Sequence, residues 1–338
     1  MESVEVTIPL AVAAWTSDAL EAAVVAQGGC AGAMRSASQW LQHPQGLAVQ
    51  AEPLLHWQTG ASAAAPAWQP SAQRPLRGVR VLDLTRVLAG PVATRLLAGL
   101  GAEVLRIDPP WWDEPAVVPE TTLGKRCARL DLRLPADRAR WEALLASADV
   151  LVHGYRGDAL QRMGLDADRR QQLRPGLVDI SLNAYGFSGP WSQRRGFDSI
   201  VQMSTGIAEA GQAAARADKP VPLPVQALDH ATGYLLAAAA LRGLERRVRE
   251  GRGSIARASL ARTAALLQSL PRTTDAAAQP LAPESQHDWS PGIEQSFWGP
   301  AQRVTWPLSV PGIAFAWDTP AGPLGSVAAN WLNDGPAL

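Results

Sequence analysis

The sequence predicts an α/β fold built on a doubly wound parallel sheet. Residues 78–84 (GVRVLDL) form a compact apolar segment typical of a buried strand, and Gly90 and Pro91 in the next turn favour the start of a helix. That helix is predicted over residues 92–100, and residues 102–108 (AEVLRID) form the second strand. Strand, helix and strand in this order predict a β–α–β unit with parallel pairing and a right-handed crossover.

Further segments extend this pattern. Residues 148–155 and 176–182 are strands of the buried type, and helices are predicted at residues 136–146 and 168–173. In such a sheet, ligands bind beyond the carboxyl ends of the strands. The turns expected to line a site follow Leu84, Asp108, Val152 and Leu182.

The segment before this region carries its own signals. Residues 4–9 indicate a short strand, and residues 17–27 and 36–41 have helical patterns. Two stretches without apolar periodicity, rich in Ala, Pro and Ser, indicate linkers. The predicted organisation is a leading segment at 1–60, a linker at 61–75, the α/β region at 76–267, a linker at 268–293 and a C-terminal segment at 294–338.

The composition restricts the classes of partner. Lys plus Arg and Asp plus Glu each number 31, so no excess charge indicates nucleic acid or an acidic membrane surface. Cys30 and Cys127 are too few for a disulfide framework, and Glu2 and Glu5 stand where a signal peptide carries positive charge. The uncharged run at residues 231–241 is too short to cross a bilayer. We expect a soluble cytoplasmic protein that binds neither nucleic acid nor a membrane.

Several common motifs are missing from the sequence. The turn TRVLAGP, residues 85–91, has one glycine, so it is neither a GxGxxG dinucleotide turn nor a Walker A loop. There is no GxSxG nucleophile elbow, and the five histidines lack metal-ligand spacing. We therefore expect no metal site and no tightly bound cofactor.

Basic residues recur near the predicted strand ends. They could form an ordinary solvated surface, or a groove for a phosphate-bearing ligand, because Arg and Lys suit phosphate oxygens. Gly124-Lys125-Arg126 is the best candidate for the groove, since a glycine allows close backbone approach. The full set is Arg86, Arg106, Lys125, Arg126, Arg133, Arg162 and Arg195.

A long apolar helix is predicted to open with Asp229, in PVQALDHATGYLLAAAALRGLERR at residues 224–247. Asp is a favoured N-cap, so Asp229 could simply cap this helix, as Asp198 could cap the helix DSIVQMSTGIAEA. The helix dipole would also keep the carboxylate ionised, and an anionic carboxylate can attack an activated acyl group. Val225, Leu228 and Ala231 are expected to keep water away from it.

Four segments in order resemble class III CoA-transferases, the formyl-CoA and carnitine CoA-transferase type that includes α-methylacyl-CoA racemase. They are LRGVRVLDLTRVLAGPVATRLLAGLGAEVLRIDPP, GKRCARLDLRLPADRARWEALLASADVLVHGYRGDALQRMGL, LVDISLNAYGFSGPWSQRRGFDSIVQMSTGI and PVPLPVQALDHATGYLLAAAALRGLERRVREGRG. The resemblance covers about residues 76–267. It implies a Rossmann-like large domain, a smaller α+β domain and a homodimer with interlocked chains.

The resemblance also implies a reaction. Asp229 would be the nucleophile that takes the acyl group from an acyl-CoA as a mixed anhydride and then holds CoA as an aspartyl thioester, before a carboxylic acid accepts the CoA. Coenzyme A thioesters would thus be substrates and no cofactor would stay bound. The implied CoA contacts are Arg86, Val87, Leu88 and Ala89 along the pantetheine, and Leu130, Arg133, Tyr155, Arg162, Met163 and Arg195, beside the basic pair Lys125 and Arg126.

Three departures from the family pattern keep alternatives open. Phe197 stands where the racemases have a histidine, which disfavours racemisation or epimerisation, and Leu88 replaces the glutamine of formyl-CoA transferases. The glycine-rich loop of the small domain is missing, so a catalytically silent CoA-binding homologue is the other alternative. Residues 20–50 and 298–326 resemble small-domain and tail segments, and the hypothesis is a small domain rebuilt from both chain ends.

Overall fold

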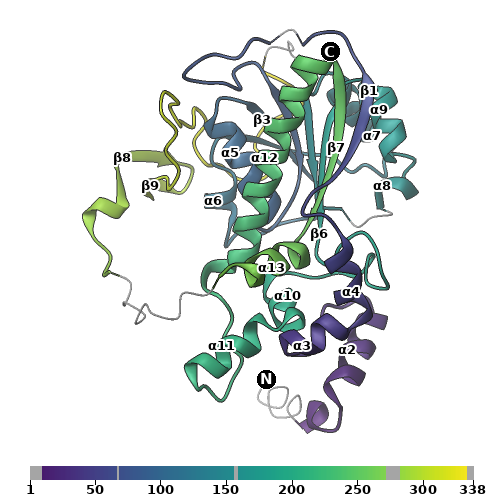
Figure 1. Cartoon of the computed structure of the whole chain (residues 1–338). Coiled ribbons are helices and arrows are strands. Elements are labelled where there is room, and N and C mark those ends of the chain that lie inside the picture. The colour runs from purple at the N-terminus through teal and green to yellow at the C-terminus, as the bar shows by residue number, and fades with distance from the viewer. Residues whose placement is uncertain (1–9, 67, 156–158, 272–281, 333–338) are drawn as a thin grey trace. The chain divides into compact units, whose positions relative to one another are not determined.

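The computed structural model describes residues 10–66, 68–155, 159–271 and 282–332 (Figure 1). The chain divides into two compact units, one comprising Met1–Leu55, Asn183–Asp229 and Ala258–Ser269, and the other His56–Leu182, His230–Arg257 and Leu270–Leu338. Residues 20–50 and 298–326, hypothesised above to form one small domain, fall in different units. The strand predicted at residues 4–9 lies outside the described residues.

The second unit contains a seven-stranded sheet in the order β1-β7-β6-β5-β2-β3-β4. Its central pairs β2–β3, β2–β5, β3–β4 and β5–β6 are parallel, whereas β1 pairs with β7 antiparallel. Because β2 lies between β3 and β5, the strand order reverses there, which is the switch point of a doubly wound sheet. The α/β fold predicted from the sequence is confirmed. The strands are β1 His56–Ser62, β2 Arg80–Leu84, β3 Glu103–Asp108, β4 Lys125–Arg129, β5 Val150–His153, β6 Val178–Asn183 and β7 Arg252–Ser259.

Helices pack on this sheet in the described part of the chain (Figure 1). They are α5 Ala89–Gly99, α6 Val118–Thr121, α7 Pro135–Ala146, α8 Ala159–Arg162, α9 Ala167–Leu173 and α12 Ala227–Glu250. Gly233 of α12 lies so close to α5 that a Cβ atom would be 2.6 Å from the Ala89 carbonyl oxygen. None of the helices in the described ranges combines the length and the apolar character that a bilayer crossing needs.

The apolar core of the sheet unit includes a residue from the C-terminal segment, Trp331. Leu82, Leu105 and Leu151 from adjacent strands, Trp141 from α7 and Trp331 near the C-terminus are all fully buried in one apolar cluster. A tryptophan buries about 150–250 Å² and dominates the energetics of such a cluster. The C-terminal segment is therefore an integral part of the sheet unit.

The C-terminal segment also follows the edge strand β4. The Gly124 N–H donates to the Thr319 carbonyl at 2.8 Å, and the Val327 N–H donates to the Cys127 carbonyl at 3.1 Å. These contacts cover backbone groups that an edge strand would otherwise leave open to other chains. Before them lies the hairpin of β8 Trp289–Ser296 and β9 Gly299–Val304.

The first unit joins segments that are far apart in the sequence. The Gln45 amide nitrogen donates to the Tyr185 and Ser188 carbonyls at 2.7 and 2.8 Å, and its oxygen accepts the Trp191 N–H at 2.6 Å. The Glu52 carboxylate accepts the N–H of Ser188 at 2.7 Å. Its helices are α2 Ser17–Ala26, α3 Ala37–Gln42, α4 Pro44–Ala51, α10 Asp198–Thr205, α11 Ile207–Ala215 and α13 Leu260–Ser269.

Two strands extend into stretches predicted as linkers. β1 runs to Ser62, within residues 61–75, and pairs with β7, while β8 begins at Trp289, within residues 268–293. Strands β4 and β7 were missed because KRCAR and RGSIARAS contain charged and small residues that hide the apolar pattern of a strand.

Gly124 generates a first prediction, because it has φ of +79° and a Cβ there would lie 2.4 Å from Cδ1 of Trp317. Gly124→Ala should lower the free energy of unfolding by about 1–3 kcal/mol, through backbone strain and displacement of the indole. Urea unfolding measures this. Gly292→Ala is the matched control, since a Cβ there meets no heavy atom within 4 Å. Equal losses in the two variants would contradict the packing role of Gly124.

Candidate functional site

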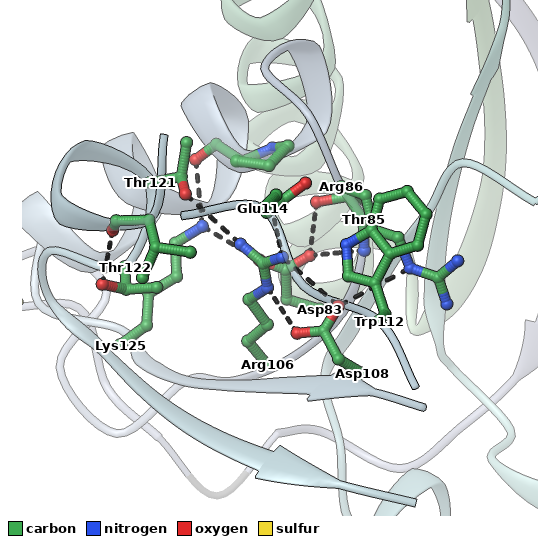
Figure 2. Close-up of polar contacts among 12 residues, drawn as sticks. Asp83, Thr85, Arg86, Arg106, Asp108, Trp112, Glu114, Thr121, Thr122 and Lys125 are labelled. Atoms are coloured by element: carbon green, nitrogen blue, oxygen red, sulfur yellow. Dashed lines mark hydrogen bonds and ion pairs between the residues drawn. The ribbon is translucent and has the colours of Figure 1, made fainter. Parts of the chain in front are cut away.

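Buried charges gather at the carboxyl ends of β2 and β3 (Figure 2). Asp83 has no exposed surface and accepts hydrogen bonds from the Thr85 N–H at 2.8 Å, the Thr94 hydroxyl at 2.6 Å and the Lys125 ammonium at 3.0 Å. Burial alone would raise the pKa of Asp83, but Lys125 and Arg106 hold it below its ordinary value. Asp83 therefore stays ionised beneath the turn that follows β2.

Lys125 does not lie at a ligand surface, contrary to the prediction for the Gly124-Lys125-Arg126 motif. Its fully buried ammonium donates to Asp83, to the Thr94 hydroxyl at 2.6 Å and to the Pro91 carbonyl at 3.1 Å. Burial lowers the pKa of Lys125, and the Asp83 carboxylate opposes that shift. The ammonium has three donors and all three are used inside the protein.

Gly124 and Arg126, the other residues of that motif, also contact other parts of the chain. Gly124 accommodates Trp317 instead of a ligand. The Arg126 guanidinium donates to the backbone and side-chain oxygens of Asn330 at 2.5 and 2.9 Å. Leu130 is 7% exposed and belongs to the apolar core. These groups hold the C-terminal segment and the core in place.

Arg106 is the centre of a second buried cluster. Its side chain has no exposed surface, and it donates to both oxygens of Asp108, at 2.7 and 3.2 Å, and to Glu114 Oε1 at 2.5 Å. Burial opposes the charge, but Asp108 and the other carboxylates raise the pKa of Arg106 above its ordinary value. Arg106 thus remains a permanent cation that orients both carboxylates (Figure 2).

The turn at residues 86–89 has an unusual backbone. Val87 has φ of +65°, and its N–H donates to Glu114 Oε2 at 3.0 Å. For a β-branched residue this region is a genuine outlier and costs about 1–3 kcal/mol. Leu88 is the N-cap of α5 without a side-chain cap bond, and Ala89 is buried as its first residue. The surrounding contacts must hold this turn in its conformation.

Arg86 lies between two aromatic rings. Its guanidinium is 4.7 Å from the centroid of Trp112 and 5.3 Å from that of Tyr155, and it donates to the Tyr155 hydroxyl at 3.2 Å. Its Nε is 3.5 Å from Asp108 Oδ1. The structure thus brings together Arg86 and Tyr155, two of the residues predicted from the sequence. It adds Trp112 and Glu114, which no sequence motif had indicated.

The remaining predicted cations are exposed. Arg133 pairs with Asp131 at 2.9 Å and lies 4.0 Å from the centroid of the Trp111 ring. Arg162 ends the short helix α8 at the surface, and Met163 after it packs on the core cluster. Arg195 lies in the first unit and donates to the Gly28 carbonyl at 2.8 Å.

Asp229 is a buried carboxylate of the first unit, in the first turn of α12. It is 6% exposed, and its N–H donates to Asp198 Oδ2 at 3.0 Å. Asp229 is inside the helix and not its N-cap, because the 3-10 turn Pro224–Gln226 directly precedes α12. Asp198 is likewise the first residue of α10, and its other oxygen accepts from Gln202 at 2.5 Å.

The ionisation of Asp229 differs from the expectation. Burial and the neighbouring Asp198 carboxylate raise the pKa of Asp229 to about 7, so the helix dipole does not dominate. Of the apolar neighbours expected to exclude water, Leu228 is buried but Val225 is 71% exposed. A carboxyl group with this pKa exists in both protonation states near neutral pH.

The largely parallel sheet with buried charges at its carboxyl edge defines an α/β protein of the doubly wound class. The sequence profile of CoA-transferase family III matches residues 76–295. The chain belongs to this family.

Individual relatives agree with this assignment. Succinyl-CoA:glutarate CoA-transferase of Mus musculus is 34% identical over 195 residues, covering 54% of this chain and 44% of that protein. Probable fatty acyl-CoA transferase Rv3272 of Mycobacterium tuberculosis is 32% identical over 213 residues, covering 58% and 53%. The crystal structure of Rv3272 has a TM-score of 0.53 at 32% identity, covering 60% of this chain and 57% of that chain. This chain spans about half the length of these curated relatives.

Asp229 generates a prediction about stability. Between the ordinary aspartate pKa of 3.8 and the folded value of about 7, the unfolded chain is ionised and the folded chain is not, so rising pH removes stability. Asp229→Asn lacks this penalty. It should raise the free energy of unfolding by up to about 4 kcal/mol at pH 8 and by much less at pH 4, as measured by urea unfolding. The exposed Asp218→Asn is the control, and a gain independent of pH would contradict the burial of the charge.

Proposed function

We propose that this chain is an acyl-CoA:carboxylate CoA-transferase that works through covalent intermediates on Asp229. The observation that carries the proposal is the buried Asp229 carboxyl group in a chain of CoA-transferase family III. Its pKa is raised to about 7, and perturbed pKa values of this kind are common among catalytic groups. One relative is named succinyl-CoA:glutarate CoA-transferase, which agrees with this chemistry. The substrates would be an acyl-CoA and a free carboxylic acid, and the assembly a homodimer.

The first half of the reaction loads CoA onto the enzyme. An ionised Asp229 oxygen attacks the thioester carbonyl carbon, the C–S bond breaks, and a mixed anhydride and the CoA thiolate result. The thiolate then attacks the aspartyl carbonyl, which releases the donor acid as a carboxylate and leaves an aspartyl-CoA thioester. Burial favours this attack because the carboxylate has few water molecules to shed.

The second half transfers CoA to the acceptor. The acceptor carboxylate attacks the aspartyl thioester and expels the thiolate, which gives a second mixed anhydride. The thiolate attacks the acceptor's carbonyl in that anhydride, so that a new acyl-CoA forms and Asp229 is regenerated as a carboxylate. No proton is consumed over the cycle, and the energy of the thioester is retained.

The second unit offers groups for the CoA. We propose that the turn at residues 86–89 lies along the pantetheine, and that Tyr155, Arg162 and Met163, with the exposed Arg133, meet the nucleotide end. Charge-assisted contacts from guanidinium groups suit phosphate oxygens. Lys125 and Leu130 are left out of this set because both side chains are buried inside the protein.

Trapping tests the intermediate directly. Incubation with an acyl-CoA and hydroxylamine should convert Asp229 to its hydroxamate, seen by peptide mass spectrometry, because hydroxylamine intercepts the anhydride or the thioester. Asp229→Ala should give no adduct and no CoA transfer. Asp218→Ala, which removes an exposed carboxylate of the same unit, should retain both.

Two outcomes would replace the proposal. The absence of an adduct with every member of an acyl-CoA panel would indicate the silent CoA-binding homologue. Loss of deuterium from the α-carbon of the acyl group without an adduct would indicate a racemase or epimerase, despite Phe197.

The pH dependence of the first half-reaction follows from the raised pKa. Only the ionised carboxylate is nucleophilic, so the rate of adduct formation should rise with pH up to the pKa of about 7 and then level off. The rate at pH 5 should be about a hundredfold below the plateau, since each pH unit below the pKa removes tenfold of the ionised form. Rapid-quench sampling followed by peptide mass spectrometry measures the rate of adduct formation at each pH. A rate that is constant between pH 5 and 8 would contradict the assignment of Asp229.

A further inference from the structure

The loop of residues 109–117, between β3 and α6, contacts the turn at residues 86–89 at two points. The Trp112 ring packs on the Arg86 guanidinium at 4.7 Å, and Glu114 Oε2 accepts the Val87 N–H at 3.0 Å. Figure 2 shows Arg86, Trp112 and Glu114 in this arrangement above the buried pair of Arg106 and Asp108. The loop therefore holds both a side chain and the backbone of the turn.

Val87 needs such a contact because of its backbone. Its φ of +65° is a region that glycine adopts readily and a β-branched residue avoids. Left alone, the residue would relax to negative φ, and Arg86 and Leu88 on either side would change direction. An acceptor placed opposite the Val87 N–H favours the observed conformation.

Glu114 is itself fixed by the core. Its two oxygens have different partners, since Oε1 accepts from Arg106 at 2.5 Å while Oε2 accepts from Val87. Arg106 has no exposed surface and is held by both oxygens of Asp108. A glutamine at this position has one acceptor oxygen and an amide that cannot face Arg106, so only a carboxylate satisfies both contacts.

We propose that Glu114 is a positioning residue that holds the turn at residues 86–89 in the conformation that receives coenzyme A. This inference rests on the proposed function, because that function places the turn along the pantetheine. Glu114 acts through the strained Val87 backbone and does not itself touch the substrate. Because Arg106 belongs to β3, its ion pair with Glu114 connects the turn to the sheet through the Val87 N–H.

A double-mutant cycle tests the inference. Glu114→Gln should raise the Kd for CoA, measured by calorimetric titration, about tenfold, which corresponds to about 1.4 kcal/mol. In the Val87→Gly background the same change should raise the Kd less than about twofold, because glycine adopts positive φ without help. A merely structural effect of Glu114 on folding would not depend on the residue at position 87.

Two controls match these variants. Arg216 also has positive φ, 50°, but lies in the other unit, so Glu114→Gln should still raise the Kd about tenfold in the Arg216→Gly background. Glu120→Gln removes a nearby carboxylate that pairs with Arg303 at 2.9 Å, and it should leave the Kd unchanged.

The outcomes separate this inference from the proposed function. Equal effects of Glu114→Gln with valine or glycine at position 87, or no effect at all, would overturn the positioning role even if Asp229 forms its adduct. The expected coupling without an adduct on Asp229 would uphold Glu114 and overturn the covalent chemistry. A wild-type chain that binds no CoA would overturn the inference as well.

Discussion

The structure depends on two ion pairs at the carboxyl edge of the sheet, Asp83–Lys125 and Asp108–Arg106, whose side chains are fully buried. Both pairs make further hydrogen bonds: Asp83 accepts from Thr85 and Thr94, Arg106 donates to Thr121, and Lys125 donates to the Pro91 carbonyl. A buried charge is tolerated when it is satisfied in this way. Removing one partner would leave an uncompensated charge and cost about 3–5 kcal/mol. The Asp83–Lys125 pair links β2 to β4, and the Asp108–Arg106 pair lies within β3 and also contacts Arg86 through Asp108.

The same edge shows how a charged motif can mislead. Lys125 stands in a Gly-Lys-Arg run that suggests phosphate, yet its partner Asp83 is 42 residues away and the space near Gly124 is filled by Trp317. Residue type alone cannot distinguish a lysine that faces a ligand from one that neutralises a buried carboxylate. Trp112 and Glu114 were missed for the converse reason, since their role comes from contacts with Arg86 and Val87 and not from any local pattern.

The ionised form of Asp229, which the proposed reaction needs, lowers the stability of the folded chain. Burial and Asp198 raise its pKa, so at neutral pH the folded chain carries a charge that the environment disfavours. Perturbed pKa values of this kind are common among catalytic groups, which is why Asp229 is the residue on which the proposed function rests. Asp198 contributes in a second way, since it accepts the Asp229 N–H and so connects the starts of α10 and α12.

The sequence by itself determined the α/β class, the strands β2, β3, β5 and β6 and the identity of Asp229 as the residue to examine, because apolar periodicity and helix signals are local properties. Only the tertiary structure decided which cations are buried, which segments join to form each unit, and that Asp229 is buried with a raised pKa. Those properties depend on neighbours distant in the sequence, such as Asp83 for Lys125 and Asp198 for Asp229. Electrostatic environment is a property of the folded surroundings, and a linear pattern does not contain it.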